Sequence, residues 1–392
     1  MGGRIFRDRE KLSPRYIPPS LPHREKQINF LLDFFRENLV NPSKAYLKVL
    51  QIIGPAGSGK TCSVLKFAEL AETLNFRRNL VHSYVNLKIQ GGSKVVLYRN
   101  LLEKCAPEAY SSSLSAEEIL RTMIKAMYEK EKYAIISLDE IDYFIRSSKD
   151  TNIIYDLTRL NEIEPGRHCN VVGVIFIARG RDFYERLDDA EKSTLGRIPL
   201  EFPPYRESEV YDILFERVRE AFLPNTVPED VIEYVSNLTA SPPVNGDIRY
   251  ALDLMYYAGN LAENLNADKV LPDHVRKVHG ELHPSITEED IINLPKKEHL
   301  ITLLAVARSL KNSRKPYVTL RDIRLNYEIV CRDMDIKPSK DMEEYLQDLH
   351  DRKIIEIRSL REIGVSGTSS ENLELFLENL LKRLEKELNE KR

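Results

Sequence analysis

The feature that most constrains the fold of this chain is a glycine-rich turn directly after a short apolar run. The run Val49–Ile53 has the length and composition of a buried strand, and the turn Gly54–Thr61 reads Gly-Pro-Ala-Gly-Ser-Gly-Lys-Thr. This turn fits the pattern G-x-x-x-x-G-K-[ST] at every fixed position. Apolar residues at helical spacing follow over Cys62–Thr73. Strand, turn and helix in this order predict a loop whose backbone N–H groups converge on a phosphate at the start of a helix.

The residue types within the turn indicate a nucleotide site. Lys60 has the length and charge to reach the β- and γ-phosphates of ATP or ADP, and the Thr61 hydroxyl is a suitable ligand for Mg²⁺. The glycines let the backbone approach the phosphates closely. The candidate nucleotide-binding residues of the turn and the position after it are Gly54, Pro55, Ala56, Gly57, Ser58, Gly59, Lys60, Thr61 and Cys62.

A second apolar run ends in two carboxylates. The run Tyr133–Leu138 leads directly into Asp139 and Glu140. Because the carboxyl ends of parallel strands share one edge of a sheet, these side chains are expected beside the turn. We expect Asp139 to hold Mg²⁺ and Glu140 to act as general base toward an attacking water.

A third candidate is an arginine at the start of a later helix, in the segment Gly246-Asp-Ile-Arg249. An arginine there can contact the γ-phosphate and so respond to its presence. Together with Lys60 and Glu140, Arg249 completes the set of candidate catalytic residues.

The first half of the chain has an alternating pattern. Runs of strand type recur at Leu80–Leu87, Val171–Ala178 and Ile198–Phe202, separated by helical spacing, before Pro203-Pro204 interrupts the pattern. This alternation predicts a parallel sheet with helices on both faces. Four helices are expected beyond it, over Glu207–Phe222, Pro228–Ser236, Gly246–Leu265 and Leu271–Gly280.

The C-terminal part combines short helices with one candidate strand. The strand Lys353–Arg358 is followed by the Gly/Ser-rich loop Gly364–Ser370 and a final helix, Glu371–Glu390. Helices followed by a small hairpin are typical of a winged helix-turn-helix. The predicted domains are an N-terminal arm over residues 1–26, a nucleotide-binding base over 27–204, a helical lid over 205–284 and a winged-helix domain over 285–392.

Composition excludes some classes of protein and leaves others open. No stretch approaches the roughly 20 apolar residues that cross a bilayer, and the N-terminus has no apolar signal core, so we expect a cytoplasmic protein without a membrane partner. The net charge of −3 does not indicate nucleic-acid binding. Basic residues nevertheless outnumber acidic ones within Met1–Lys26 and within Lys296–Arg324. Each segment could form a phosphate-contacting surface or simply a basic face in contact with solvent.

These motifs, in this order, resemble the archaeal origin-recognition and cell-division-control initiator family, AAA+ ATPases that mark replication origins. The resemblance covers nearly the whole chain and includes the arm segment Phe6–Glu25, the lid segment Phe202–Tyr205 and the sensor 2 segment Gly246–Leu254. It implies an α/β P-loop AAA+ domain, an all-α lid and a C-terminal winged helix. It also implies bound ATP or ADP with Mg²⁺, and it places Tyr205 and Arg217 in the lining of the nucleotide pocket. The implied partners are double-stranded origin DNA, the replicative helicase and paralogous initiators.

Two departures from the family pattern bear on hydrolysis. The family's sensor 1 strand usually ends in asparagine, whereas Arg179 stands at that position here. Where the family has a Pro-Arg pair, this chain has Asp189-Ala190, so the candidate arginine finger is missing. An arginine finger can be worth ~10³–10⁵ in rate. We therefore expect slow ATP hydrolysis with normal nucleotide binding.

A third departure lies in the DNA-reading domain. With Ser339 as N-cap, the expected recognition helix Lys340–Arg352 is acidic on its exposed face, and the expected wing Ile363–Ser370 carries no arginine. Contacts are instead expected through phosphates and shape. A helical insertion between Gly91 and Tyr110, with Lys94, Arg99 and Lys104, is a further candidate for DNA contact. The candidate DNA-binding residues of the C-terminal domain are Arg308, Lys311, Arg314, Lys315, Arg358 and Arg361.

Two alternatives remain open from the residues alone. In the first, the chain is an ADP-bound, DNA-binding regulator of initiation or transcription without significant ATPase activity. In the second, it is an ATPase that acts only through protein partners. The altered sensor 1, the absent arginine finger and the acidic recognition helix all lean toward the first alternative.

Overall fold

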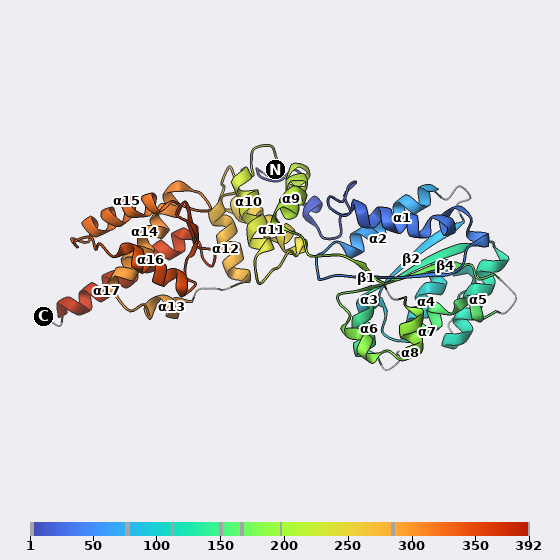
Figure 1. Ribbon diagram of the computed structural model, residues 1–392. Helices are drawn as coiled ribbons and strands as arrows, with labels where there is room; N and C mark the ends of the chain where they lie inside the picture. Colours follow the sequence, from blue (N-terminus) through green and yellow to red (C-terminus); the bar gives the residue numbers. More distant parts are fainter. Residues whose placement is uncertain are drawn as a thin grey trace. The chain divides into compact units, whose positions relative to one another are not determined.

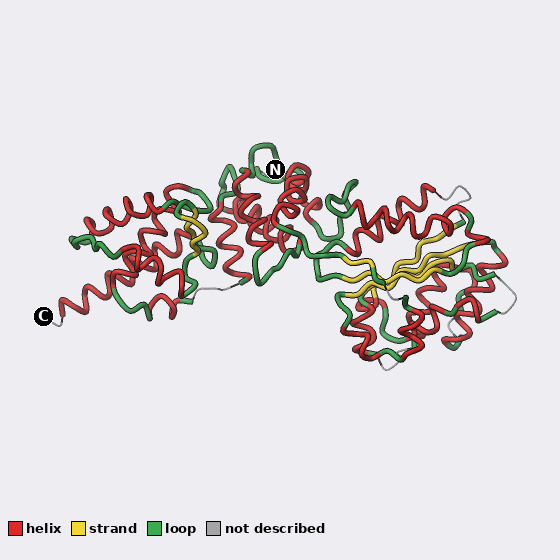
Figure 2. Tube along the Cα trace, in the orientation of Figure 1, coloured by secondary structure: helices red, strands yellow, loops and turns green. Residues whose placement is uncertain are grey.

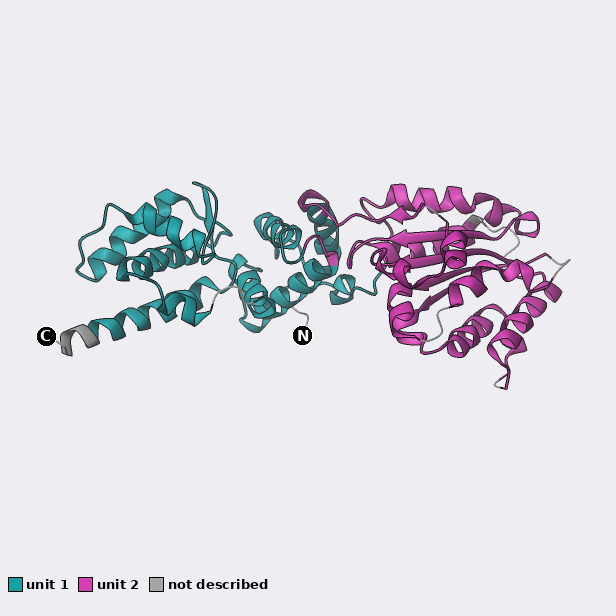
Figure 3. Ribbon diagram, turned by 60° about the horizontal axis from the view of Figure 1, so that its bottom comes forward, with its two compact units in different colours: residues 1–16, 210–244, 249–392 teal, residues 17–209, 245–248 magenta. Residues whose placement is uncertain are grey.

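The computed structural model describes residues 4–74, 79–111, 113–148, 152–164, 168–196, 198–283 and 287–390. The chain forms two compact units, shown in Figure 3. One unit comprises residues 17–209 and 245–248, and the other comprises residues 1–16, 210–244 and 249–392.

A five-stranded sheet forms the centre of the first unit (Figure 2). Its order is β2-β3-β4-β1-β5, and every neighbouring pair is parallel. The strand expected at Ile198–Phe202 is shorter than predicted, and the other strands expected in this sheet agree with the structure to within one residue at each end. The strand expected at Lys353–Arg358, in the other unit, begins only at Glu356. The strands are β1 (Lys48–Ile53), β2 (Leu80–Asn86), β3 (Tyr133–Asp139), β4 (Val171–Ala178) and β5 (Leu200–Glu201).

Helices cover both faces of this sheet, as expected (Figure 1). Alternate residues of one strand point to opposite faces. Ile135 of β3 therefore packs with Phe35 and Phe67 of the helices α1 and α2, whereas Ile136 packs with the helices on the other face. The helices of this unit are α1 (Glu25–Val40), α2 (Lys60–Leu74), α3 (Leu87–Gln90), α4 (Lys94–Cys105), α5 (Ala116–Glu129), α6 (Ile141–Ser147), α7 (Ile153–Thr158) and α8 (Asp189–Thr194).

The second unit is mostly helical. Its first four helices follow the predicted ranges closely: α9 (Glu207–Ala221, whose first three residues belong to the first unit), α10 (Glu229–Ala240), α11 (Ile248–Asn264, whose first residue belongs to the first unit) and α12 (Pro272–Leu282). The C-terminal part then contains α13 (Glu288–Ile292), α14 (Lys297–Ser313), α15 (Leu320–Asp333), α16 (Met342–Asp351), β6 (Glu356–Ser359), β7 (Glu362–Gly364) and α17 (Ser370–Glu390). Val318 pairs with Ile363 as a third extended segment beside the hairpin. This arrangement is a winged helix-turn-helix, as expected. The predicted boundary at residues 284 and 285 lies outside the described residues.

The arm of the second unit is more ordered than an extended segment. Residues Arg9–Leu12 of the predicted arm form a 3₁₀ turn. Ile5, Phe6 and Leu12 are buried, and the ring of Phe6 stacks on that of Phe222 at 4.7 Å between centroids. Apolar residues at these positions therefore anchor the arm to the lid helices.

Two details of the winged helix correct the sequence-based expectation. The recognition helix α16 begins at Met342 with Asp341 at the N-cap position, and the Ser339 hydroxyl instead accepts the backbone N–H of Asp341 at 3.1 Å. The hairpin turns at residues 360 and 361, so the wing tip lies before the Gly/Ser-rich loop. That loop packs against α12, where a side chain on Gly280 would overlap the carbonyl oxygen of Gly367.

None of the helices that the structure describes has the length and apolar character needed to span a membrane.

Candidate functional site

The glycine-rich turn joins the end of β1 to the start of α2. Gly57 and Gly59 have φ angles of 66° and 87°, the left-handed region that glycine adopts without cost. A side chain on Gly57 would overlap the carboxylate of Asp247, and one on Gly59 would overlap the hydroxyl of Tyr205. Both glycines are therefore required by conformation and by space.

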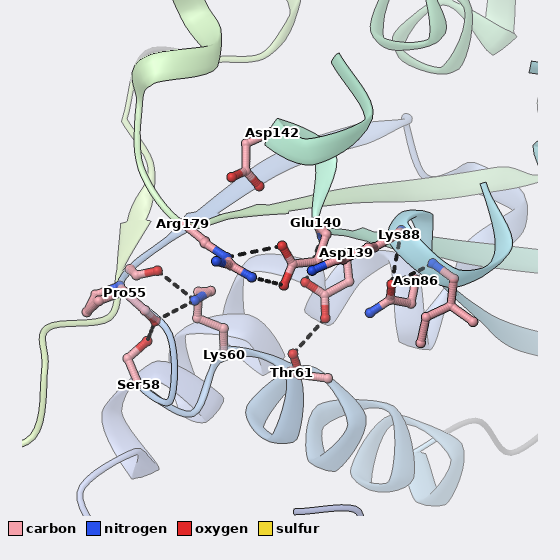
Figure 4. Close-up of polar contacts among 12 residues, drawn as sticks. Pro55, Ser58, Lys60, Thr61, Asn86, Lys88, Asp139, Glu140, Asp142 and Arg179 are labelled. Carbon is pink, nitrogen blue, oxygen red and sulfur yellow. Dashed lines mark hydrogen bonds and ion pairs between the residues drawn. The ribbon is translucent and has the colours of Figure 1, made fainter. Parts of the chain in front are cut away.

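Lys60 is the first residue of α2, and its side chain folds back over the turn. Its ammonium donates to the carbonyl oxygens of Gly54 and Pro55 at 2.6 and 2.7 Å, and the Ser58 hydroxyl donates to Pro55 at 2.9 Å (Figure 4). Lys60 is buried, with 9% of its surface exposed. The turn therefore holds the Lys60 ammonium at a helix N-terminus, and both the ammonium and the helix dipole suit a polyphosphate.

Asp139 accepts three hydrogen bonds at the end of β3. Its Oδ2 accepts from the hydroxyls of Thr61 at 2.6 Å and Tyr84 at 2.8 Å, and its Oδ1 accepts the N–H of Glu140 at 2.9 Å. Burial, and next to it the Asp139 charge, raise the pKa of Tyr84 well above its ordinary value, so this hydroxyl keeps its proton. The Thr61 hydroxyl and the Asp139 carboxylate are oxygen ligands of the kind that Mg²⁺ uses together with substrate phosphates. The pair fits the expected metal.

Glu140 has a backbone φ of 60°, which is unusual for a residue with a side chain. Its two carboxylate oxygens accept from Nε and Nη2 of Arg179, each at 3.2 Å. This hydrogen bonding is the main cause that raises the pKa of Arg179, so the guanidinium stays charged. Figure 4 shows the Arg179 side chain extending from the end of β4 toward Glu140.

Arg24, the residue directly before α1, forms hydrogen bonds with the glycine turn. Its Nε donates to the Ser58 carbonyl at 2.8 Å and its Nη2 to the Pro203 carbonyl at 2.7 Å, and its guanidinium lies 3.9 Å from the centre of the Tyr205 ring. Arg24 is 2% exposed, and burial raises the pKa of Tyr205 to about 12. The structure therefore brings Tyr205 to the turn, together with an arginine that the sequence motifs alone did not single out.

The chain matches known families along most of its length. Residues 46–187 match the AAA domain, residues 211–280 match the Cdc6 AAA+ ATPase-type lid domain, and residues 289–367 match the CDC6 C-terminal winged helix domain. The ORC1-type DNA replication protein 2 of Saccharolobus solfataricus is 31% identical over 369 residues, which cover 92% of this chain and 87% of the relative. This chain belongs to the family of ORC1-type DNA replication proteins. The resemblance seen in the motifs is thereby confirmed.

Other ORC1-type relatives and solved structures agree. The ORC1-type DNA replication protein 1 of Sulfurisphaera tokodaii is 34% identical over 318 residues, 81% of this chain and 76% of the relative. The crystal structure of Cdc6p from Pyrobaculum aerophilum matches with a TM-score of 0.78 and 25% identity, covering 97% of this chain and 99% of that one. The Aeropyrum pernix ORC1 protein in complex with DNA matches with a TM-score of 0.63 and 25% identity, covering 98% and 100%. These similarities do not favour the regulator alternative.

The two remaining nucleotide-site candidates of this ORC1-type protein belong to its second unit. Arg217 of α9 is 7% exposed and donates to the carbonyls of Lys11 and Tyr16 at 3.3 and 3.4 Å, with its guanidinium 4.8 Å from the Tyr16 ring centre. Arg249 is the second residue of α11, directly after the segment 245–248 that belongs to the first unit. Arg217 is thus held by the arm.

The candidate DNA contacts of this ORC1-type protein fall into two groups. Arg308 pairs with Asp333, Glu374 and Glu378 at 2.9 to 3.3 Å, and Lys311 pairs with Glu374 at 2.6 Å. Arg358 donates to the Asn237 side chain and lies over the Tyr317 ring at 4.7 Å. Within the described residues, no ion pair engages the side chains of Arg314, Lys315 and Arg361.

The candidates on the insertion after β2 are also engaged. Lys94 pairs with Asp156 at 2.7 Å and Glu117 at 3.4 Å, and the Lys104 ammonium donates to the backbone carbonyl of Tyr84. The insertion does contain a helix, α4, as expected. Both lysines of this helix form contacts within the protein in this structure.

Proposed function

We propose that this ORC1-type protein binds ATP or ADP with Mg²⁺, recognises duplex DNA at replication origins and helps to initiate DNA replication. The observation that carries the proposal is the joint placement of Lys60 in the glycine turn and of Thr61 against Asp139. The matches to a Cdc6-type lid domain and to a CDC6 winged helix domain support the other two elements of the proposal, nucleotide binding with a lid and DNA binding with a winged helix. The similarity to the Aeropyrum pernix ORC1 protein, whose structure was solved in complex with DNA, supports the DNA partner.

The proposed roles of the site residues follow from their chemistry. The residues 54–62 bind the phosphates, with Lys60 toward the β- and γ-phosphates. Thr61 and Asp139 hold Mg²⁺, which would offset the negative charge of the phosphates. Tyr205 and Arg217 line the pocket from the lid side, and Arg249 responds to the γ-phosphate. Lys60, Glu140 and Arg249 together form the proposed catalytic set.

Hydrolysis by this arrangement is proposed to be slow. Glu140 would accept a proton from the attacking water, while the chain has neither an asparagine at residue 179 to orient that water nor the arginine finger. Glu140→Gln should keep nucleotide binding and remove residual hydrolysis. Multiple-turnover hydrolysis by the purified protein above about one per second would contradict slow turnover.

The proposed domains are the arm over residues 1–26, the nucleotide-binding base over 27–204, the lid over 205–284 and the DNA-binding winged helix over 285–392. DNA contacts are proposed mainly from Arg314, Lys315 and Arg361, since acidic neighbours offset the charges of Arg308 and Lys311. Arg358 is proposed as a further DNA contact, because it lies on β6, the strand that leads into the wing tip. Recruitment of the replicative helicase and cooperation with paralogous initiators are proposed on the family resemblance.

A fragment-selection experiment tests the proposed function. Sheared genomic duplex DNA from the source organism is passed over the immobilised protein with ADP, with ATP or without nucleotide, and the retained fragments are sequenced. We expect strong enrichment of a few loci that depends on the bound nucleotide. Retention that is uniform across the genome would contradict origin recognition.

A further inference from the structure

The contact between Arg179 and Glu140 has the geometry of a two-pronged ion pair. Nε and Nη2 of the guanidinium each donate over 3.2 Å to a separate carboxylate oxygen. Such parallel pairing matches the planar fork of arginine to a carboxylate and fixes the orientation of both groups. A lysine could not reproduce this arrangement, because it offers a single point charge.

The backbone holds each partner in place. Glu140 has its N–H bonded to Asp139 Oδ1 at 2.9 Å and a φ of 60°, so its side chain leaves the strand end in a defined direction. Arg179 follows Ala178, the last residue of β4, and β4 lies between β1 and β3 in the sheet. Arg179 therefore extends from the end of β4, the strand that lies between β1, which leads into the glycine turn, and β3, which ends at the two carboxylates. The charges of Asp142 and Asp139 also favour the charged guanidinium at this place.

A general base needs a free lone pair directed at the water. In hydrolysis the water oxygen forms a bond to the γ-phosphorus, its proton passes to a Glu140 oxygen, and the bond to the bridging oxygen breaks so that ADP leaves with the electron pair. Two donors from Arg179 occupy one lone pair on each Glu140 oxygen and fix the direction of the lone pair that remains on each. The pair must turn or open before a free lone pair can be directed at a water elsewhere in the site.

We infer that Arg179 is a positioning residue that holds Glu140 away from the attacking water and so restrains hydrolysis without contributing to nucleotide binding. This inference rests on the proposed nucleotide-binding function. The side chain of Arg179 is half exposed, with 50% of its surface accessible, whereas that of Glu140 is 19% exposed. Exposed ion pairs contribute up to about 1 kcal/mol, so the restraint is expected to reduce the rate by up to about fivefold.

The test compares Arg179→Ala and Arg179→Lys with a matched control, Arg181→Ala. Arg181 lies two residues away and pairs with Glu201 at 3.4 Å on an exposed surface. The first readout needs no nucleotide: carboxyl groups are labelled with a carbodiimide and glycine ethyl ester, and labelling of the Glu140 peptide is measured by mass spectrometry. We expect severalfold greater labelling of Glu140 in Arg179→Ala, a smaller increase in Arg179→Lys and no change in Arg181→Ala.

The second readout is hydrolysis, measured alongside ADP affinity. Arg179→Ala should hydrolyse ATP about two- to fivefold faster than the wild type with unchanged ADP affinity. Unchanged labelling would overturn the ion pair in solution, and increased labelling with an unchanged or lower rate would overturn the restraint. If the wild type and all variants bind no nucleotide, the proposed function fails instead, and the labelling result still reports on the pair.

Discussion

The Thr61 hydroxyl donates to Asp139 Oδ2 over 2.6 Å, although the two residues are 78 positions apart in the chain. This bond joins the end of the glycine turn to the end of β3. It places a hydroxyl and a carboxylate where one magnesium ion could bind both the protein and a nucleotide phosphate. The proposed metal site therefore depends on the sheet order, which separates β1 from β3 by a single strand.

Replacing Thr61 by valine tests this metal site, because valine keeps the shape and removes the hydroxyl. We expect Thr61→Val to bind ATP about tenfold more weakly than the wild type in Mg²⁺, and equally well in excess EDTA. Calorimetric titration in both conditions measures the difference. An equal loss of affinity with and without Mg²⁺ would show that the hydroxyl serves the loop and not the metal.

Two basic residues with no ion pair in the described structure are the best test of the DNA surface. Arg314 and Lys315, changed together to alanine, should lower the slope of log affinity against log salt by about two, because each phosphate contact contributes about 0.9. Arg308→Ala is the matched control, since its guanidinium is already paired with three carboxylates. Fluorescence anisotropy on a labelled duplex gives the slopes. A steep slope that survives the double change would remove these residues from the interface.

Arg276 of α12 is the largest fully buried side chain, with 1% of its surface exposed. It donates to the carbonyls of Val365, Lys315 and Pro316 at 2.6 to 3.1 Å and to Asp273 at 3.0 Å. Arg276→Ala would remove the side-chain donor from the carbonyls of Lys315 and Pro316 and leave a cavity, so we expect a loss of about 3 kcal/mol in the free energy of unfolding. Arg352→Ala, which removes an exposed pair with Asp348, should change it by less than about 1 kcal/mol. Chemical denaturation compares the two, and similar small losses would argue against a structural role for Arg276.

His279 predicts how the stability of the second unit depends on pH. Burial, and next to it the charge of His283, lower the pKa of His279 to about 4 from 6.5. The unfolded chain therefore takes up a proton below pH 6.5 that the folded chain takes up only near pH 4, so stability falls as the pH drops through this window. His279→Gln should weaken this dependence. Melting temperatures between pH 7.5 and 4.5 check it, and equal slopes for variant and wild type would contradict the assignment.

Much of the fold follows from local patterns in the sequence. The strands β1 to β4 were predicted to within a residue at each end, because each is a short apolar run bounded by turn residues. The glycine turn was also found, since its spacing is that of a known motif, and the Asp139-Glu140 pair was found because it ends an apolar run. These features need no knowledge of distant contacts.

Long-range contacts account for what the sequence did not reveal. The pairing of Arg308 with Glu374 and Glu378 depends on α17 folding back along α14, so part of a cluster that looks basic in the sequence is neutralised in space. The predicted Ser339 cap was wrong, because the helix begins later and Asp341 takes the N-cap position. The contacts of Arg24 with the turn and of Tyr84 with Asp139 also join distant segments. Tyr84 could have been placed near Asp139 only by predicting that β2 and β3 are neighbours in the sheet, as the structure shows them to be.

The most direct test of this account is whether the folded protein carries an adenine nucleotide. Native mass spectrometry and calorimetry should find one ADP or ATP per chain in the wild type and in Lys66→Ala, whose lysine on the same helix pairs with the exposed Glu69. Lys60→Ala should be folded and empty, because the ammonium that reaches the phosphates is gone. A folded wild-type protein that is empty and does not respond to added ADP or ATP, or a Lys60→Ala protein that retains one nucleotide per chain, would contradict the account.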